Sequence, residues 1–153
     1  MRQQAKNCVG MLYHEDAWTK DYAVFVAEEE SRILGFAELL TRLYRYFLEY
    51  GELYVIEILL GDQWLPIGDV ALCPDTVPIL IGSEEYRSKG YGKRALTLVV
   101  QRARHLGWKK LITCGIYTYN PRSRGLFESV GFKLVDTRLD EEGQLCWFHE
   151  MEL

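Results

Sequence analysis

A glycine-rich turn between an apolar run and a helical pattern constrains this chain more than any other stretch. The apolar run at 77–81 ends at Gly82, the turn spans 87–93, and apolar residues at helical spacing follow to His105. The order is therefore strand, turn, helix. The first N–H groups of a helix have no partner within it, and the helix dipole is positive there. With three cationic side chains in the turn, this order predicts a seat for a phosphate or pyrophosphate.

The spacing of the turn excludes two common nucleotide-binding motifs. Arg87, Gly90 and Gly92 form R-x-x-G-x-G, which lacks the G-x-x-x-x-G-K-[ST] order of a Walker loop. No third glycine follows at the position that a dinucleotide-binding turn requires. Because Gly90 and Gly92 have no Cβ, a ligand can approach the backbone closely at both positions.

The pattern of the whole chain predicts one α+β domain over residues 1–153, with a mostly antiparallel sheet and helices on its faces. Strands separated by short turns are expected at 53–60, 64–72 and 76–82, which indicates an antiparallel meander. Further strands are expected at 109–117, 132–137 and 145–152, and helices at about 90–105 and at 121–130. A helix is also expected to end near Tyr50, with Gly51 as its stop. Residues 22–40 fit either a helix or a hairpin.

Charge and cysteine usage exclude several classes of function. The net charge is −4 and the pI is about 5.4, which argues against general nucleic-acid binding. No signal peptide, transmembrane segment or metal-ligand cluster is expected. Without metal-knuckle or C-x-x-C spacing, the four cysteines are interpreted as reduced, buried thiols of a cytoplasmic protein. They are Cys8, Cys73, Cys114 and Cys146.

A second motif, N-x-x-S-x-x-x-F-x-x-x-G-F, begins at Asn120 directly after an expected strand. Asparagine is a favoured helix N-cap, and Pro121 suits the first helical turn. Gly131 is a plausible end for the helix. Taken alone, this stretch predicts only a short, capped helix.

The two motifs in this order resemble the GNAT superfamily of acetyl-CoA-dependent N-acetyltransferases. The strand that carries Pro66, Gly68 and Asp69 also resembles the ribosomal-protein alanine acetyltransferase branch. The resemblance runs from about residue 53 to the C-terminus. It implies a GNAT-like fold, with a mixed central sheet that is mostly antiparallel and has helices on both faces. It also implies acetyl-CoA as co-substrate, and it leaves a homodimer open.

The resemblance implies a set of cofactor-binding positions. The strand before the turn meets the pantetheine arm through its backbone, the turn holds the pyrophosphate, and the second motif contacts the cofactor arm. The positions implied are Leu80, Ile81, Gly82, Arg87, Ser88, Lys89, Gly90, Tyr91, Gly92, Lys93, Asn120 and Ser123.

The implied reaction is direct attack of a neutral primary amine on the thioester in a ternary complex. A base takes the amine proton, and a backbone N–H near Gly82 is a candidate oxyanion donor. Many members place a tyrosine acid seven residues after the motif's asparagine, where this chain has Phe127. Tyr117 and Tyr119 are candidates to replace it. The base candidates are Glu57, which interrupts an apolar strand, and the carboxylates Asp69, Glu84 and Glu85.

Two alternatives remain open at this point. A sensor that binds acyl-CoA without turnover would explain Phe127, and a structural domain that binds phosphate would need no CoA at all. The acceptor amine is not specified by any motif. Candidates are a protein N-terminus, a small polyamine or amino acid, and an aminoglycoside.

Overall fold

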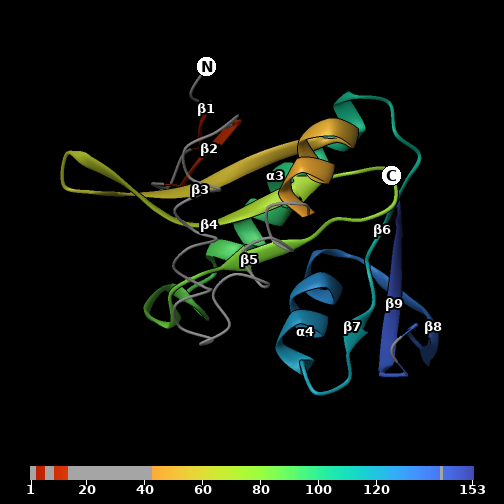
Figure 1. The fold of residues 1–153 in the computed structure, drawn as a ribbon. Helices are drawn as coiled ribbons and strands as arrows, with labels where there is room; N and C mark the ends of the chain where they lie inside the picture. Colours follow the sequence, from red (N-terminus) through yellow and green to blue (C-terminus); the bar gives the residue numbers. More distant parts are fainter. Residues whose placement is uncertain (1–2, 6–8, 14–42, 142) are drawn as a thin grey trace.

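The computed structural model describes residues 3–5, 9–13, 43–141 and 143–153 (Figure 1). Its described strands form two sheets in which every pairing is antiparallel. The first sheet has the order β1 (Gln3–Ala5), β2 (Val9–Tyr13), β3 (Glu52–Leu60), β4 (Gln63–Leu72) and β5 (Ile79–Ile81). Residues 22–40, with their open choice between helix and hairpin, and Cys8 lie outside the described residues.

The expected meander is confirmed by the pairing of β3 with β4 and of β4 with β5. Gly61 turns the chain between β3 and β4 with a φ of +59°, a conformation that glycine adopts without strain. The third strand is shorter than the expected range 76–82, because a bridge between Cys73 and Thr76 first closes a tight turn.

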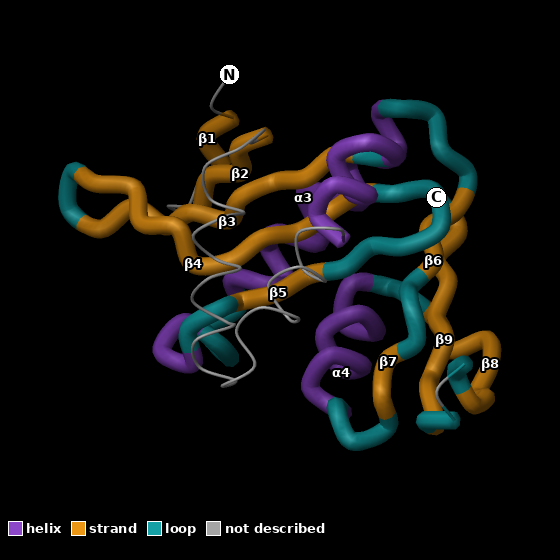
Figure 2. Tube along the Cα trace, in the orientation of Figure 1, coloured by secondary structure: helices purple, strands orange, loops and turns teal. Residues whose placement is uncertain are grey.

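Helices cover both faces of this sheet, as the α+β expectation requires (Figure 2). On one face, α3 (Tyr91–His105) contributes Leu96 and Val99 to a core that also contains Ile56 and Val70. On the other face, the helical residues 43–50 contribute Tyr44 and Phe47 to a separate cluster. The sheet residues of that cluster are Leu53, Ala71 and Cys73.

The second sheet is built around β9 (Leu145–Glu152), which pairs with β6 (Lys110–Ile112), β7 (Ile116–Tyr117) and β8 (Lys133–Leu139). The helix α4 (Pro121–Val130) connects β7 to β8. β5 and β6 belong to different sheets, and the single continuous strand expected at 109–117 is wrong.

The break between β6 and β7 has two physical causes. The hydroxyl of Thr113 accepts the N–H of His149 at 3.1 Å, so a side chain takes the place of a ladder carbonyl. A Cβ on Gly115 would lie 3.0 Å from the Cβ of Cys146, so the two segments approach too closely for a regular strand residue.

The burial of the described cysteines agrees only in part with the expectation from the sequence. Cys73 and Cys146 are buried and free, as expected, whereas Cys114 is exposed, so the expectation of burial is wrong there. Cys114 falls in the break between β6 and β7.

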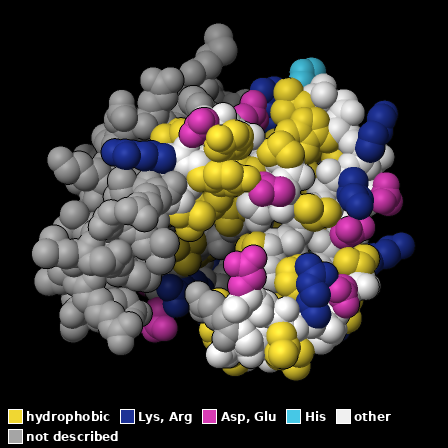
Figure 3. All heavy atoms as spheres, turned by 45° about the vertical axis from the view of Figure 1, so that its right-hand side comes forward, with side chains coloured by type: hydrophobic (Ala, Val, Ile, Leu, Met, Phe, Trp, Pro, Cys, Tyr) yellow, Lys and Arg dark blue, Asp and Glu magenta, His cyan; other side chains and the backbone are white. Residues whose placement is uncertain are grey.

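Figure 3 shows acidic and basic side chains interspersed on the described part of one face, without a basic tract. Within the described ranges, no helix is both long and apolar enough to span a membrane.

Candidate active site

A cavity of about 500 Å³ lies where β5, the turn before α3 and the start of α4 meet. Residues from both sequence motifs line it. They are Ile79, Leu80, Ile81, Tyr86, Arg87, Ser88, Gly90, Gly92, Lys93, Asn120, Arg122, Ser123 and Leu126. Three of the implied cofactor positions, Gly82, Lys89 and Tyr91, are not among these lining residues. The cavity therefore joins two stretches that the sequence analysis identified separately.

The turn before α3 has the backbone geometry of an anion seat. Ser88 and Gly90 both adopt the left-handed conformation, with φ of +58° and +85°. Left-handed residues within a turn direct successive N–H groups into one concavity, where they bind anions. Gly90 is also the N-cap of α3, so the unpaired N–H groups of that helix begin at the same place. The strained conformation of Ser88, a residue with a Cβ, is typical of functional turns.

The two glycines of the turn serve different purposes. A Cβ on Gly90 would meet no atom of the described residues within 4 Å, so this part of the structure leaves the backbone open to a ligand there. A Cβ on Gly92 would lie 3.2 Å from Cδ2 of Leu126 on α4. The absence of a side chain at Gly92 thus permits the close approach of α3 to Leu126, which would have to shift if a methyl group were added.

The cations of the site are arranged differently from the sequence expectation. Lys93 is exposed and lines the cavity, and Arg122, which the sequence analysis missed, lines it from α4. The ammonium of Lys89 instead lies 5.7 Å from the centre of the Tyr86 ring. Arg122 carries no signal in the sequence beyond its position two residues after the N-cap Asn120.

Arg87 contacts the protein backbone. Its Nε donates to the carbonyl of Ile81 at 2.9 Å, and its Nη2 donates to the carbonyl of Gly82 at 3.0 Å. The N–H of Gly82 donates to the carbonyl of Ile67 at 2.9 Å. This N–H is already used within the sheet, so a backbone oxyanion donor near Gly82 would have to be another N–H.

The start of α4 follows the second motif. Oδ1 of Asn120 accepts the N–H of Ser123 at 3.2 Å, which is the capping interaction expected from the sequence. Phe127 is buried and packs edge-on against Phe132, with ring centres 5.1 Å apart. The position of the family's tyrosine acid is therefore part of the hydrophobic core.

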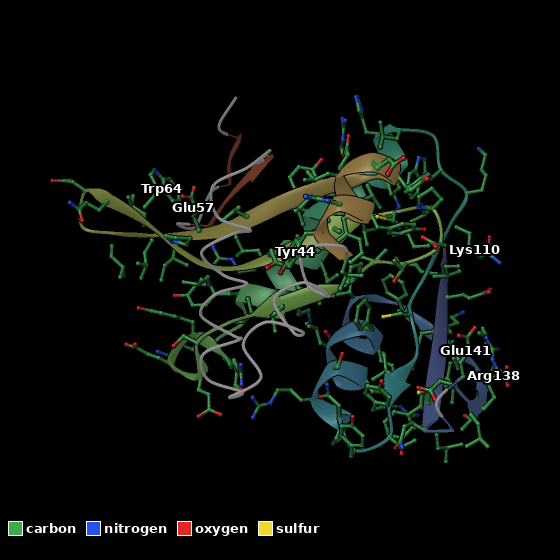
Figure 4. All side chains as sticks on the ribbon, viewed as in Figure 1. Tyr44, Glu57, Trp64, Lys110, Arg138 and Glu141 are labelled. Atoms are coloured by element: carbon green, nitrogen blue, oxygen red, sulfur yellow. The ribbon has the colours of Figure 1, made fainter. Side chains whose placement is uncertain are left out.

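Two buried carboxylates lie on the sheet face opposite α3. Asp69 of β4 is opposite Val55 of β3, and Glu57 is two residues further along β3 on the same face. Tyr44 reaches from the helical residues 43–50 towards β4, and Glu57 lies on β3 nearer the β3–β4 turn, opposite Pro66 (Figure 4). The sequence leaves open whether Glu57 is buried or half-exposed, and the structure shows it buried, with an exposed fraction of 9%.

Among the described carboxylates, Asp69 has the pKa that burial shifts furthest. Burial raises its pKa to about 7, although a hydrogen bond from the Tyr44 hydroxyl at 2.7 Å opposes the shift. Asp69 also pairs across the sheet with Leu80, which lines the cavity. An ionisable group that titrates near neutrality therefore lies one strand away from the cavity.

The remaining candidates lie elsewhere. Tyr117 and Tyr119 stack on each other with ring centres 4.9 Å apart, and neither is among the described residues that line the cavity. Glu84 and Glu85 are exposed on the 3₁₀ turn η1 (Glu84–Tyr86). Among the residues that the structure describes, no three His, Cys, Asp or Glu side chains are grouped to hold a metal ion.

Comparisons with known proteins agree with this geometry. The sequence model of the acetyltransferase (GNAT) family matches residues 9–132. An uncharacterised N-acetyltransferase of Bacillus subtilis (strain 168), YycN, is 37% identical over 59 residues, a stretch that covers 39% of this chain and 37% of that protein.

Solved structures share the fold at low identity. Spermidine N-acetyltransferase from Vibrio cholerae, in complex with CoA and spermine, superposes with a TM-score of 0.75 at 16% identity and covers 96% of each chain. Ribosomal-protein-S5-alanine acetyltransferase from Vibrio fischeri superposes with a TM-score of 0.68 at 12% identity, covering 99% of this chain and 96% of that one. The resemblance to the alanine acetyltransferase branch is thus confirmed at the level of the fold.

The fold is that of the acetyl-CoA-dependent N-acetyltransferases. The chain belongs to the acetyltransferase (GNAT) family. It is accordingly an acyltransferase whose co-substrate is acetyl-CoA, and the GNAT-like α+β fold expected from the two motifs is confirmed.

Proposed function

We propose that this chain transfers the acetyl group of acetyl-CoA to a primary amine by direct attack in a ternary complex. The observation that carries the proposal is the cavity beside β5, which residues of both motifs line. The anion seat at Ser88 and Gly90 would take the pyrophosphate. The pantetheine arm would lie along the edge of β5 that pairs with no described strand. The thioester would then lie beside the strand that pairs with Asp69.

The amine would approach from the sheet face that carries Asp69 and Glu57. A carboxylate that titrates at about pH 7 suits proton abstraction from an amine at neutral pH. We therefore favour Asp69 as the general base, with Glu57 attracting a cationic acceptor to the same face. The amine nitrogen forms a bond to the carbonyl carbon, the C–S bond breaks, and the thiolate leaves and takes up a proton.

The acceptor is best sought among cationic amines. Two buried carboxylates on one face favour a ligand that brings positive charge. The Vibrio cholerae neighbour was crystallised with spermine, which supports placing polyamines first in an acceptor panel that also includes amino acids, aminoglycosides and peptides with free N-termini.

The test is the release of free thiol from acetyl-CoA across this panel between pH 5.5 and 9. With the best acceptor, kcat/KM should rise with pH through about 7, because Asp69 must be ionised to accept a proton. Asp69→Asn should lower kcat by roughly 100-fold or more and remove this limb, with unchanged affinity for acetyl-CoA. The matched control is Glu85→Gln, a change at an exposed carboxylate. An Asp69→Asn enzyme with a normal rate and pH profile would place the base elsewhere.

A sensor without turnover is the second candidate, and the burial of Phe127 at the position of the family's acid favours it. Tight binding of acetyl-CoA with no thiol release on any amine of the panel would support the sensor. In the catalytic case, Tyr117→Phe and Tyr119→Phe test whether either tyrosine replaces the missing acid. A fall in kcat at unchanged KM in one of these variants would identify it as the acid.

A further inference from the structure

The guanidinium of Arg87 binds two consecutive carbonyls at the end of β5, although its place in the glycine-rich motif suggests a phosphate contact. Nε and Nη2 donate to the carbonyls of Ile81 and Gly82, and Nη1 lies 3.6 Å from a carboxylate oxygen of Glu84. All three guanidinium nitrogens therefore have a partner within the protein. We infer that Arg87 is a positioning residue that holds the pantetheine-binding edge of β5 in shape, and that the phosphates are bound by other groups.

The pairing of β5 explains why its end needs such support. The carbonyl of Pro78 accepts from Ala71, and the N–H of Gly82 donates to Ile67, so these two residues face β4. Because backbone groups alternate in direction along a strand, the N–H and carbonyl of Ile79 and Ile81 face the edge of β5 that pairs with no described strand. This edge is the one that an extended ligand arm would pair with. Its last carbonyl, that of Ile81, is the one that Arg87 binds.

The contact fixes the strand and the turn relative to each other. Tyr86 and Arg87 donate their N–H groups to the carbonyls of Ser83 and Glu84, which shapes the short 3₁₀ turn η1. The side chain of Arg87 then reaches back from the end of this turn to the end of β5. A planar guanidinium can span two carbonyls at once, whereas the ammonium of a lysine is a single point of charge. The planar shape of the Arg87 side chain, rather than its charge, should therefore determine how well it holds the end of β5.

The cations that remain for the phosphates are on the helices. Lys93 and Arg122 both line the cavity, and no hydrogen bond or ion pair to a described residue is assigned to either side chain. Lys93 follows the anion seat in the first turn of α3, and Arg122 lies in the first turn of α4. If Arg87 holds β5 while Lys93 and Arg122 bind the phosphates, substitutions at these two kinds of residue should weaken the binding of different fragments of acetyl-CoA.

The experiment measures binding of three ligands by calorimetry or by competition: acetyl-CoA, S-acetylpantetheine, which lacks the phosphates, and ADP, which lacks the pantetheine arm. The inference rests on acetyl-CoA as co-substrate, so the wild type is titrated first. Arg87→Gln should lower the affinity for acetyl-CoA and for S-acetylpantetheine by a similar factor, about 10-fold. The affinity for ADP should stay within about 2-fold of that of the wild type. Lys93→Gln should lower the affinity for acetyl-CoA and for ADP, and it should leave the affinity for S-acetylpantetheine unchanged.

Arg87→Lys separates shape from charge. If Arg87 positions β5, the lysine variant should resemble Arg87→Gln, and the amide resonances of Ile81 and Gly82 should shift in both. Retained ADP binding in these variants shows that they are folded. The inference is overturned if Arg87→Lys binds acetyl-CoA as the wild type does, or if Arg87→Gln loses ADP affinity while keeping that for S-acetylpantetheine. A wild type that does not bind acetyl-CoA overturns the proposed function together with this inference.

Discussion

The hydroxyl of Tyr44 donates a hydrogen bond to Oδ2 of Asp69 at 2.7 Å and joins the helical residues 43–50 to β4. Both side chains are buried, so the bond forms away from bulk water. It stabilises the ionised form of Asp69, but burial has the larger effect and raises the pKa to about 7. The site thus contains a carboxylate whose charge changes near neutral pH.

This pKa makes the stability of the protein depend on pH. Between pH 3.8 and about 7 the folded state binds more protons at Asp69 than the unfolded state, so its contribution to stability falls as the pH rises. Above pH 7 the contribution is constant. Asp69→Asn removes the ionisation while its amide oxygen can still accept from Tyr44. Relative to wild type, the variant should therefore gain up to about 4 kcal/mol between pH 4 and pH 8, at 1.36 kcal/mol per pKa unit.

Urea unfolding of both proteins at pH 4, 6 and 8 measures this difference. A free-energy difference that stays constant over the three pH values would mean that Asp69 titrates normally in the folded protein, and the argument for it as a base would lose its support.

The ion pair between Glu52 and Arg102 joins β3 to α3. Nε and Nη2 of Arg102 donate to the two carboxylate oxygens at 2.9 and 2.6 Å, and the Tyr54 hydroxyl also donates to Glu52. Arg102 holds the pKa of Glu52 below its usual value, so the pair stabilises the fold above pH 4.5 and less as the pH falls through the lowered value. Because both side chains are partly exposed, Glu52→Gln should cost about 1 kcal/mol at pH 7.

Thermal or urea unfolding at pH 7 and pH 3 checks this cost, which should shrink at the lower pH. Glu85→Gln, a change at an exposed carboxylate, serves as the control and should be neutral. Equal losses at both pH values would attribute the effect to packing instead of charge.

Substitution by alanine should affect stability differently at two glycines that lie in helices. Gly125 lies within α4, and a Cβ there would meet no atom within 4 Å in the part of the chain that the structure describes. Gly125→Ala should therefore raise the free energy of unfolding by about 0.5–1 kcal/mol. At Gly92 the added methyl would press on Leu126, which lines the cavity. Gly92→Ala should not raise the free energy of unfolding, and it should lower the affinity for acetyl-CoA. Unfolding and calorimetric titration of the two variants compare these effects, and a stabilising Gly92→Ala with full affinity would contradict the packing argument.

Local patterns predict much of this structure because they record local physical requirements. The strands at β3, β4 and β9, the helix after Gly90, and the cap at Asn120 all follow from periodicity and capping chemistry. The break at 113–115 depends on a contact between Thr113 and His149, residues far apart in the chain, and nothing near Thr113 indicates it.

The site shows the same division. The glycine-rich turn and the Asn120 motif indicate a cofactor cavity, but a cation in such a turn suits a carbonyl as well as a phosphate, and only the fold shows which partner Arg87 meets. Likewise, an aspartate in a strand fits either face until the sheet is covered, so the burial of Asp69 depends on the helix that carries Tyr44.

The most direct test of the account is calorimetric titration with acetyl-CoA of the wild type and two charge-reversal variants. Lys93→Glu places a carboxylate in the cavity, whereas Lys109→Glu makes the same change at an exposed position outside its lining. We expect the wild type and Lys109→Glu to bind acetyl-CoA with equal affinity. Lys93→Glu should lose at least about 10-fold in affinity, which corresponds to 1.4 kcal/mol. Equal affinities for all three proteins would contradict the assignment of this cavity as the acetyl-CoA site.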